Sequence, residues 1–149
     1  MISLGNLYLG NKMVGIPYFN APWFDKTAIH MRAIPGVTSV FNPADEDRRS
    51  GFDPMRCPNG TAEEAEAAGF DRRRALGADW LWISTYSNGL VIGPDWERST
   101  GTMSEIACHQ ALGLPVWEAD IFFGRIDKGK DKELPDPDWQ LPRLRLVYR

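Results

Sequence analysis

Residues Gly93 to Pro115 read GPDWERSTGTMSEIACHQALGLP, and this stretch decides how the rest of the chain is interpreted. The short apolar run before it, Gly89 to Ile92, is typical of a buried strand. Gly, Ser and Thr then give a polar turn, and a helix follows to Leu112 with one carboxylate, Glu105, in its first turns. A strand that leads through such a turn into a helix N-terminus forms an anion-binding crevice at the carboxyl edge of a sheet.

The segments on either side of this stretch alternate between strand and helix patterns. Apolar runs bounded by Gly and Pro predict strands, and capping residues followed by helical periodicity predict helices. Strands are expected over Leu4 to Leu9, Val37 to Phe41, Leu90 to Ile92 and from Pro115 to Trp117, with a further strand within Leu144 to Arg149; helices are expected over Asn20 to Ala33, Thr61 to Leu76 with a break at Gly69, and Gly77 to Ile83. This order predicts an α/β fold, in which a mostly parallel sheet has helices on both faces.

The length of 149 residues fits one domain with a substantial core. We expect this domain to span residues 1–126, and a charged, Pro-rich tail over 127–149 to pack on it or on a neighbouring subunit. Residues 45–59 are polar, contain two prolines and are expected to form an irregular insertion, in which the charged run Asp45 to Arg49 is solvated.

Charge and composition narrow the classes of partner. The formal net charge of −3 gives no reason to expect a nucleic acid polymer or an anionic membrane as the main partner. No apolar run approaches the length of a membrane span, and the first residues lack the pattern of a signal peptide. The sequence therefore predicts a cytoplasmic protein, in the host cytoplasm if the chain is phage-encoded. Cys57 and Cys108 are expected to be reduced there, and neither they nor His30 and His109 have the spacing of metal ligands.

Several stretches in a fixed order resemble one superfamily. They are Leu7-Tyr-Leu-Gly10, Asn42-Pro-Ala44, Ala78-Asp-Trp-Leu81, Ser87 to Ile92, Pro94 to Glu105 with its Ser99-x-Gly101-x-x-x-Glu105 spacing, and Ala111 to Val116. Together they resemble the nucleoside 2-deoxyribosyltransferase superfamily, in particular a branch of small phage and bacterial proteins, and they are similar to the nucleoside 5′-monophosphate N-glycosidases. The resemblance covers residues 4–117 and leaves out the tail and the insertion.

The resemblance implies a flavodoxin-like or Rossmann-like three-layer sandwich that forms a homodimer or a larger homo-oligomer. It implies three catalytic residues: Glu105 attacks C1′ of the sugar, Asp79 assists departure of the base, and Tyr8 lines the sugar site. It also implies that Ser99 and the loop after the first strand hold a 5′-phosphate. We therefore expect substrate or phosphate contacts from Ser99, Arg98, Gly101, Gly10, Asn11 and Lys12. The first loop lacks the serine of the hydrolases and its basic residue is displaced, which weakens the expectation of a 5′-phosphate.

Each of these residues also has a purely structural interpretation. Glu105 can be a helix acid favoured by the dipole, Asp79 or Ser99 can be an N-cap, and Tyr8 can be a core residue. Arg98 and Lys12 can be solvated or ion-paired.

The function expected from the sequence is hydrolysis of the base–sugar bond of a (deoxy)nucleoside 5′-monophosphate through a glutamate nucleophile, without cofactor or metal. Two alternatives stay open: base exchange by a nucleoside 2-deoxyribosyltransferase, and a nucleotide-binding sensor without catalysis. In all three cases the partner is a small nucleotide or nucleoside.

Overall fold

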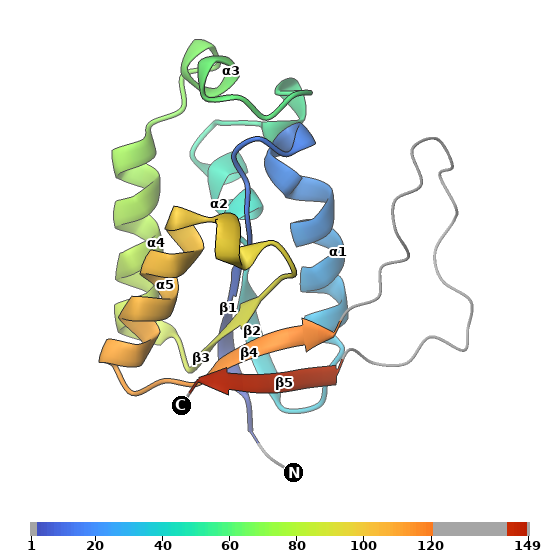
Figure 1. Ribbon diagram of the computed structural model, residues 1–149, viewed down its shortest axis with the longest axis vertical. Helices are drawn as coiled ribbons and strands as arrows, with labels where there is room; N and C mark the ends of the chain where they lie inside the picture. The colour runs from blue at the N-terminus through green and yellow to red at the C-terminus, as the bar shows by residue number, and fades with distance from the viewer. Residues whose placement is uncertain (1–2, 121–142, 149) are drawn as a thin grey trace, which may run out of the picture.

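The computed structural model describes residues 3–120 and 143–148, which form a five-stranded sheet with helices on both faces (Figure 1). The strands are β1 (Gly5–Gly10), β2 (Val37–Phe41), β3 (Gly89–Ile92), β4 (Val116–Asp120) and β5 (Arg143–Tyr148). They lie in the order β2-β1-β3-β4-β5; the first four are parallel, and β5 runs antiparallel to β4. This confirms the predicted α/β fold with its mostly parallel sheet.

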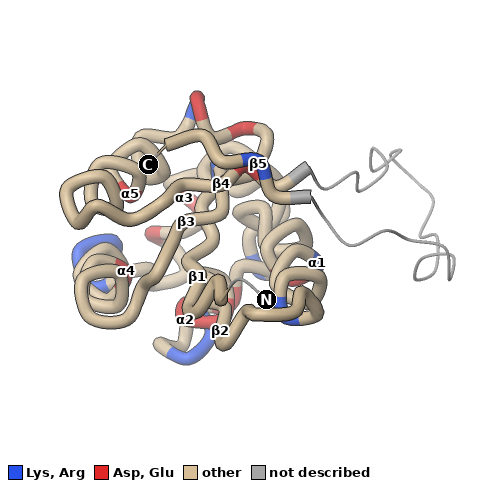
Figure 2. Tube along the Cα trace, turned by 90° about the horizontal axis from the view of Figure 1, so that it is seen from below, with Lys and Arg blue, Asp and Glu red and all other residues tan. Residues whose placement is uncertain are grey.

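The helices are α1 (Ala21–Arg32), α2 (Pro43–Arg49), α3 (Ala62–Ala67), α4 (Arg72–Tyr86) and α5 (Thr100–Ala111), and short 3₁₀ turns occupy η1 (Pro17–Asn20), η2 (Pro54–Arg56) and η3 (Trp96–Arg98). Seen from below, the sheet lies between α1 on one side and α4 with α5 on the other (Figure 2). Side chains of Asn42, Asp71 and Ser99 accept hydrogen bonds from backbone N–H groups at the starts of α2, α4 and α5. Such caps satisfy donors that a helix start otherwise leaves open.

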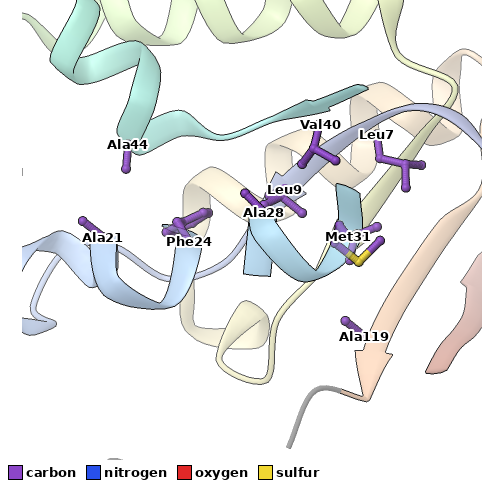
Figure 3. Packing of buried hydrophobic residues seen from close by; sticks show 10 residues of the cluster. Leu7, Leu9, Ala21, Phe24, Ala28, Met31, Val40, Ala44 and Ala119 are labelled. Carbon is purple, nitrogen blue, oxygen red and sulfur yellow. The ribbon is translucent and has the colours of Figure 1, made fainter. Parts of the chain in front are cut away.

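Alternation along β1 divides the core into two layers. Leu7 and Leu9 point toward α1, where Phe24, Ala28 and Met31 pack against them (Figure 3). Each large apolar side chain buried in this way contributes about 1.5–3 kcal/mol relative to exposure.

Tyr8 points to the opposite face, because successive strand residues alternate in direction. It packs there with Leu90 and Ile92 of β3, Ile83 of α4 and Ile106 of α5. The phenol of Tyr8 is thereby buried under α4 and α5.

Residues 45–59 are more regular than the sequence predicted. Asn42 caps a helix there, Pro43 occupies its first turn, and acidic residues precede Arg48 and Arg49 in the order that the helix dipole favours. The prediction of an irregular insertion is therefore wrong for α2, and residues 54–56 add a 3₁₀ turn. The sequence shows no apolar periodicity over this helix, because its buried face holds few apolar side chains.

The expected break at Gly69 is confirmed, since α3 ends before it and Gly69 has a φ of +80°. The separate helix predicted over Gly77 to Ile83 is wrong. Asp71 caps one continuous helix, α4, which passes through Gly77 to Tyr86. Asp79 therefore lies inside this helix and is not an N-cap.

The C-terminal strand expected within residues 144–149 is present as β5, which pairs with β4. The remainder of the proposed tail, residues 127–142, lies outside the described residues. Within the described part of the chain, no helix has the length and apolar character needed to cross a bilayer, and Cys57 and Cys108 are free thiols.

Strand order reverses beside β1: the chain goes from β1 to β2 on one side and then to β3 on the other. Open α/β sheets hold their ligands at such a point, outside the carboxyl ends of the strands. Gly10 and Ile92 are paired at those ends, and the backbone N–H of Gly93 donates to the Gly10 carbonyl at 2.9 Å. The loops after β1 and β3 therefore meet at this edge, where the sequence predicted a crevice.

Candidate functional site

The centre of the candidate site is a buried pair formed by β1 and α5. The hydroxyl of Tyr8 donates a hydrogen bond to Oε1 of Glu105 at 2.9 Å. Tyr8 is fully buried and Glu105 is 9% exposed. The β1 register aims Tyr8 at α5, and the Ser99 cap fixes where α5 begins, so the fold itself brings these two residues together.

The second oxygen of the Glu105 carboxyl group, Oε2, is buried without a hydrogen-bond partner. It lies against the backbone of Gly10, where an added Cβ would be 2.7 Å from Oε2 and 3.2 Å from Leu90 Cδ1. Any residue other than glycine at this position would collide with Oε2. A buried acceptor without a hydrogen bond destabilises the folded state. The position of Oε2 is therefore not explained by a contribution to stability.

Asp79 approaches the same tyrosine from α4. The pKa of Asp79 is raised to about 7, chiefly because burial penalises its charged form; interaction with the Tyr8 hydroxyl opposes this rise, and the nearby Glu46 adds to it. A carboxyl group with such a pKa can hold or release a proton near neutral pH.

The pKa of Glu105 is raised by the same buried environment. Burial raises its pKa well above the ordinary range, the Asp79 charge raises it further, and the Tyr8 hydrogen bond lowers it. The pKa of Tyr8 is also raised, first by burial and then by the charges of Glu105 and Asp79, so its hydroxyl keeps its proton and acts as a donor. The three predicted catalytic residues therefore form one electrostatic unit.

Asn11 joins the loops after β1 and β3. Its Oδ1 accepts from the backbone N–H groups of Lys12, at 2.9 Å, and Asp95, at 3.1 Å. Because both neighbours donate, the amide orientation is fixed with Nδ2 on the other side, and Nδ2 is buried without a partner. Gly93 accommodates this amide, since an added Cβ would be 2.4 Å from Nδ2. An oriented, unused donor on Asn11 and the unused acceptor of Glu105 thus both lie at the carboxyl ends of β1 and β3.

The remaining predicted binding residues are less closely tied to this centre. Ser99 is the N-cap of α5, and its Oγ accepts from the backbone N–H of Thr102 at 3.1 Å. Arg98 pairs with Asp95 at 2.7 Å, and its side chain is 68% exposed. An added Cβ on Gly101 would be 3.8 Å from Ser99 Oγ, so no close approach requires this glycine. Lys12 contributes its backbone: its carbonyl accepts from Asn20 Nδ2 at 2.9 Å.

His109 supports the site and was missed by reasoning from the sequence. It is fully buried, its Nδ1 donates to the Glu105 carbonyl at 2.8 Å, and its Nε2 lies 2.8 Å from Ser87 Oγ. Burial lowers its pKa, which favours the neutral ring. His109 therefore ties the backbone of the helix turn that carries Glu105 to Ser87, the residue that ends α4 two positions before β3. Its i+4 spacing from Glu105 was the available signal.

Asp47 was also missed, because the charged run that contains it was expected to be solvated. That expectation is wrong for Asp47, which is 8% exposed. Ala44 and Asp47 are three residues apart and share the buried face of α2. The pKa of Asp47 is raised to about 7, first by burial and then by the charge of Asp79. The Asn42-Pro43 helix start was a signal for the helix, but it does not indicate which face of the helix is buried.

Among residues 3–120 and 143–148, no cluster of three or more His, Cys, Asp or Glu side chains could hold a metal ion. Comparisons with models of known protein families, with curated proteins and with solved structures gave no significant match.

Proposed function

We propose that the chain is an N-glycosidase that hydrolyses the base–sugar bond of a (deoxy)nucleoside 5′-monophosphate, with Glu105 as the nucleophile. The observation that carries the proposal is the state of the Glu105 carboxyl group. One oxygen is held by the Tyr8 hydroxyl at 2.9 Å, and the other is buried, unpartnered and pressed against Gly10. A carboxylate fixed through one oxygen leaves the other without a competing hydrogen bond, and attack on C1′ requires that the packing over Oε2 opens when the substrate binds.

The division of roles follows from the chemistry of the bond. Cleavage builds positive charge on the sugar ring and negative charge on the departing base. Glu105 in its ionised form stabilises the ring and bonds to C1′, while Asp79 in its acid form delivers a proton to the base as the C1′–N bond breaks. Water then attacks C1′, returns a proton to Asp79 and releases the sugar and Glu105. The developing positive charge offsets the burial that otherwise disfavours ionised Glu105.

The predicted site for the 5′-phosphate is the start of α5. The N-terminus of α5 favours an anion, and Ser99 and Arg98 lie beside it. Arg98, however, is exposed and already paired with Asp95. The Asn11 amide can donate to either a phosphate or a hydroxyl oxygen. Unphosphorylated nucleosides are therefore a required part of any substrate panel.

Base exchange is the second candidate, and burial of Glu105 favours it. A glycosyl group attached to a carboxylate that is only 9% exposed is shielded from water. A second base that binds in place of the first would then compete with hydrolysis. Supplying a second free base and measuring the new nucleoside distinguishes transfer from hydrolysis.

The test is incubation with the common nucleosides and their monophosphates, followed by chromatography for free base. The wild-type chain should release base, and Glu105→Gln should lose this activity while staying folded. Glu97→Gln is the matched control, because Glu97 is an exposed carboxylate in the same stretch of sequence. Equal turnover by Glu105→Gln and wild type would contradict the proposal. Tight binding of an intact nucleotide without base release would instead support the sensor alternative.

Two further predictions accompany this proposal. The first is a homodimer or larger homo-oligomer, for which the exposed apolar side chains of Trp80, Leu81 and Tyr86 on α4 offer a surface. Light scattering at several concentrations measures the oligomeric state. The second is a cytoplasmic location, which fractionation of expressing cells tests.

A further inference from the structure

We propose that Ser87 and His109 are positioning residues, which fix α5 against β1 so that the Glu105 carboxyl group meets the Tyr8 hydroxyl. Neither side chain contacts the substrate in this scheme; both act through Glu105. Only the consequence for catalysis rests on the proposed N-glycosidase function. The link between the two elements is a property of the folded protein.

The first support is the direction of the hydrogen bonds made by His109, whose side chain is fully buried. The backbone carbonyl of Glu105 can only accept, so Nδ1 of the ring, 2.8 Å away, carries a hydrogen and donates it. On a neutral ring Nε2 is then an acceptor, and the Ser87 hydroxyl at 2.8 Å is its donor. The oxygen of that hydroxyl accepts in turn from the Gly89 N–H at 3.3 Å. The bonds therefore run in one direction toward Glu105, an arrangement in which each bond strengthens the next.

The second support is the anchoring of Ser87 to the strand that carries Tyr8. Ser87 is the C-cap of α4, and the residue after it, Asn88, exchanges two hydrogen bonds with Asn6 of β1. The Asn88 N–H donates to the Asn6 carbonyl at 2.7 Å, and Asn88 Oδ1 accepts from the Asn6 N–H at 2.8 Å. Gly5 leaves room for this amide, because its φ is +67° and an added Cβ would be 2.3 Å from Asn88 Oδ1. The junction between α4 and β3 is therefore fixed to β1.

Together these bonds form a closed circuit between β1 and α5. One arm is direct and consists of the 2.9 Å hydrogen bond from the Tyr8 hydroxyl to Glu105 Oε1. The other arm runs from β1 through Ser87 and His109 to the backbone of Glu105. The Tyr8 ring also lies beside the His109 ring, with 6.2 Å between the centroids. Because residues four apart share a helix face, Tyr8 contacts α5 at two points one turn apart.

The polar link sets the rotation of α5, which apolar packing alone does not. Hydrophobic contact is non-directional, whereas a hydrogen bond requires a defined distance and angle. Rotation matters here because Glu105 Oε2 lies against Gly10, where an added Cβ would be only 2.7 Å away. Misplacement of a reacting group by about 1 Å can lower a rate about 100-fold. A pair of residues at the opposite end of β3 from the crevice thus controls the geometry of the nucleophile.

The experiment follows the proton NMR signal of the Tyr8 hydroxyl, which should exchange slowly because Tyr8 is fully buried. Its chemical shift reports the hydrogen bond to Glu105, and Tyr8→Phe assigns it. Ser87→Ala and His109→Met each remove the link and should move the signal. In His109→Gln an amide can accept from Ser87 in place of Nε2, so the signal should stay close to that of wild type. Ser84→Ala is the matched control, because it makes the same change on α4 at an exposed serine and should have no effect.

Base release should follow the same order. Ser87→Ala and His109→Met should lower kcat by about 10-fold to 100-fold and leave KM nearly unchanged, because the substrate contacts stay in place. His109→Gln should recover most of this loss. In a double-mutant cycle, Ser87→Ala should cost much less when Tyr8→Phe is already present, since the pair that Ser87 positions is then broken.

An unmoved Tyr8 signal in Ser87→Ala would overturn the proposal, and so would losses that simply add in the double-mutant cycle. If His109→Met does not fold, Ser87→Ala still tests the link without any change in α5. Absence of base release from the wild-type chain, together with a moved Tyr8 signal in Ser87→Ala, would refute the N-glycosidase function and leave the link between α5 and β1 standing.

Discussion

The hydrogen bond from Tyr8 to Glu105 makes Tyr8→Phe the most informative single change. The variant keeps the ring, which stacks on Phe41 at a centroid distance of 5.0 Å, and removes only the donor at 2.9 Å from Oε1. Glu105 would then have both oxygens buried without a partner, since Oε2 already lacks one. A hydrogen bond to a charged group contributes about 1.5–3 kcal/mol, and about 1.4 kcal/mol corresponds to one pKa unit. The pKa of Glu105 should therefore rise by about one to two units.

This rise has a defined effect on the pH profile of kcat/KM. The acid limb, which reports ionisation of Glu105, should move upward by about one to two pH units, and the rate on that limb should fall by about 10-fold to 100-fold. Asp79 also loses the interaction that lowers its pKa, so the alkaline limb should move upward as well. Tyr86→Phe is the control, because the Tyr86 side chain is exposed. Acid limbs that coincide in Tyr8→Phe and wild type would refute the assignment of Tyr8 as the donor that supports ionised Glu105.

Three other predictions concern the Gly10 contact, the burial of Glu105 and the buried acids Asp47 and Asp79. Gly10→Ala should abolish base release and destabilise the fold, because the new Cβ would lie 2.7 Å from Glu105 Oε2. Gly77→Ala is the control: this position has open space around it, so the change should leave the melting temperature unchanged or raise it. Glu105→Gln should raise the free energy of unfolding at about pH 8, since it removes a buried carboxylate, and urea titration measures this; a loss of stability there would contradict the burial argument. The free energy of unfolding of the wild-type chain should fall as the pH rises from about 4 to about 7, because Asp47 and Asp79 bind protons in the folded state that the unfolded chain has already lost. Asp47→Asn should flatten this pH dependence. A slope equal to that of wild type would argue against a buried carboxyl group at Asp47.

The sequence contained most of the information about the sheet. The apolar runs over Leu4 to Leu9 and Leu90 to Ile92 predict strands, and the strand–loop–helix pattern around Ser99 predicts a crevice. The path of α4 was harder to predict. Gly77 and the short spacing to Asp79 suggested a new helix, whereas the Asp71 cap and packing of Ile83 on the sheet extend one helix through both positions.

The contact between Tyr8 and Glu105 follows from the topology, whereas the placement of Asp47 and His109 depends on burial. Glu105 and Tyr8 meet because parallel strand ends and the helix after them converge at one edge of the sheet. Asp47 and His109 could not be assigned in this way. Whether a charged residue on a short helix faces the solvent or the core depends on what packs beside it, and a local pattern of charges does not contain that information.

The proposed mechanism depends on a covalent bond between Glu105 and C1′ of the sugar. The most direct measurement is mass spectrometry of acid-quenched protein after brief incubation with a cleaved nucleoside or nucleotide, followed by peptide mapping. We expect a mass increase equal to the glycosyl group on the peptide that contains Glu105, and no such increase in Glu105→Gln. Base release by Glu105→Gln at the wild-type rate, or an adduct on a different residue, would contradict it.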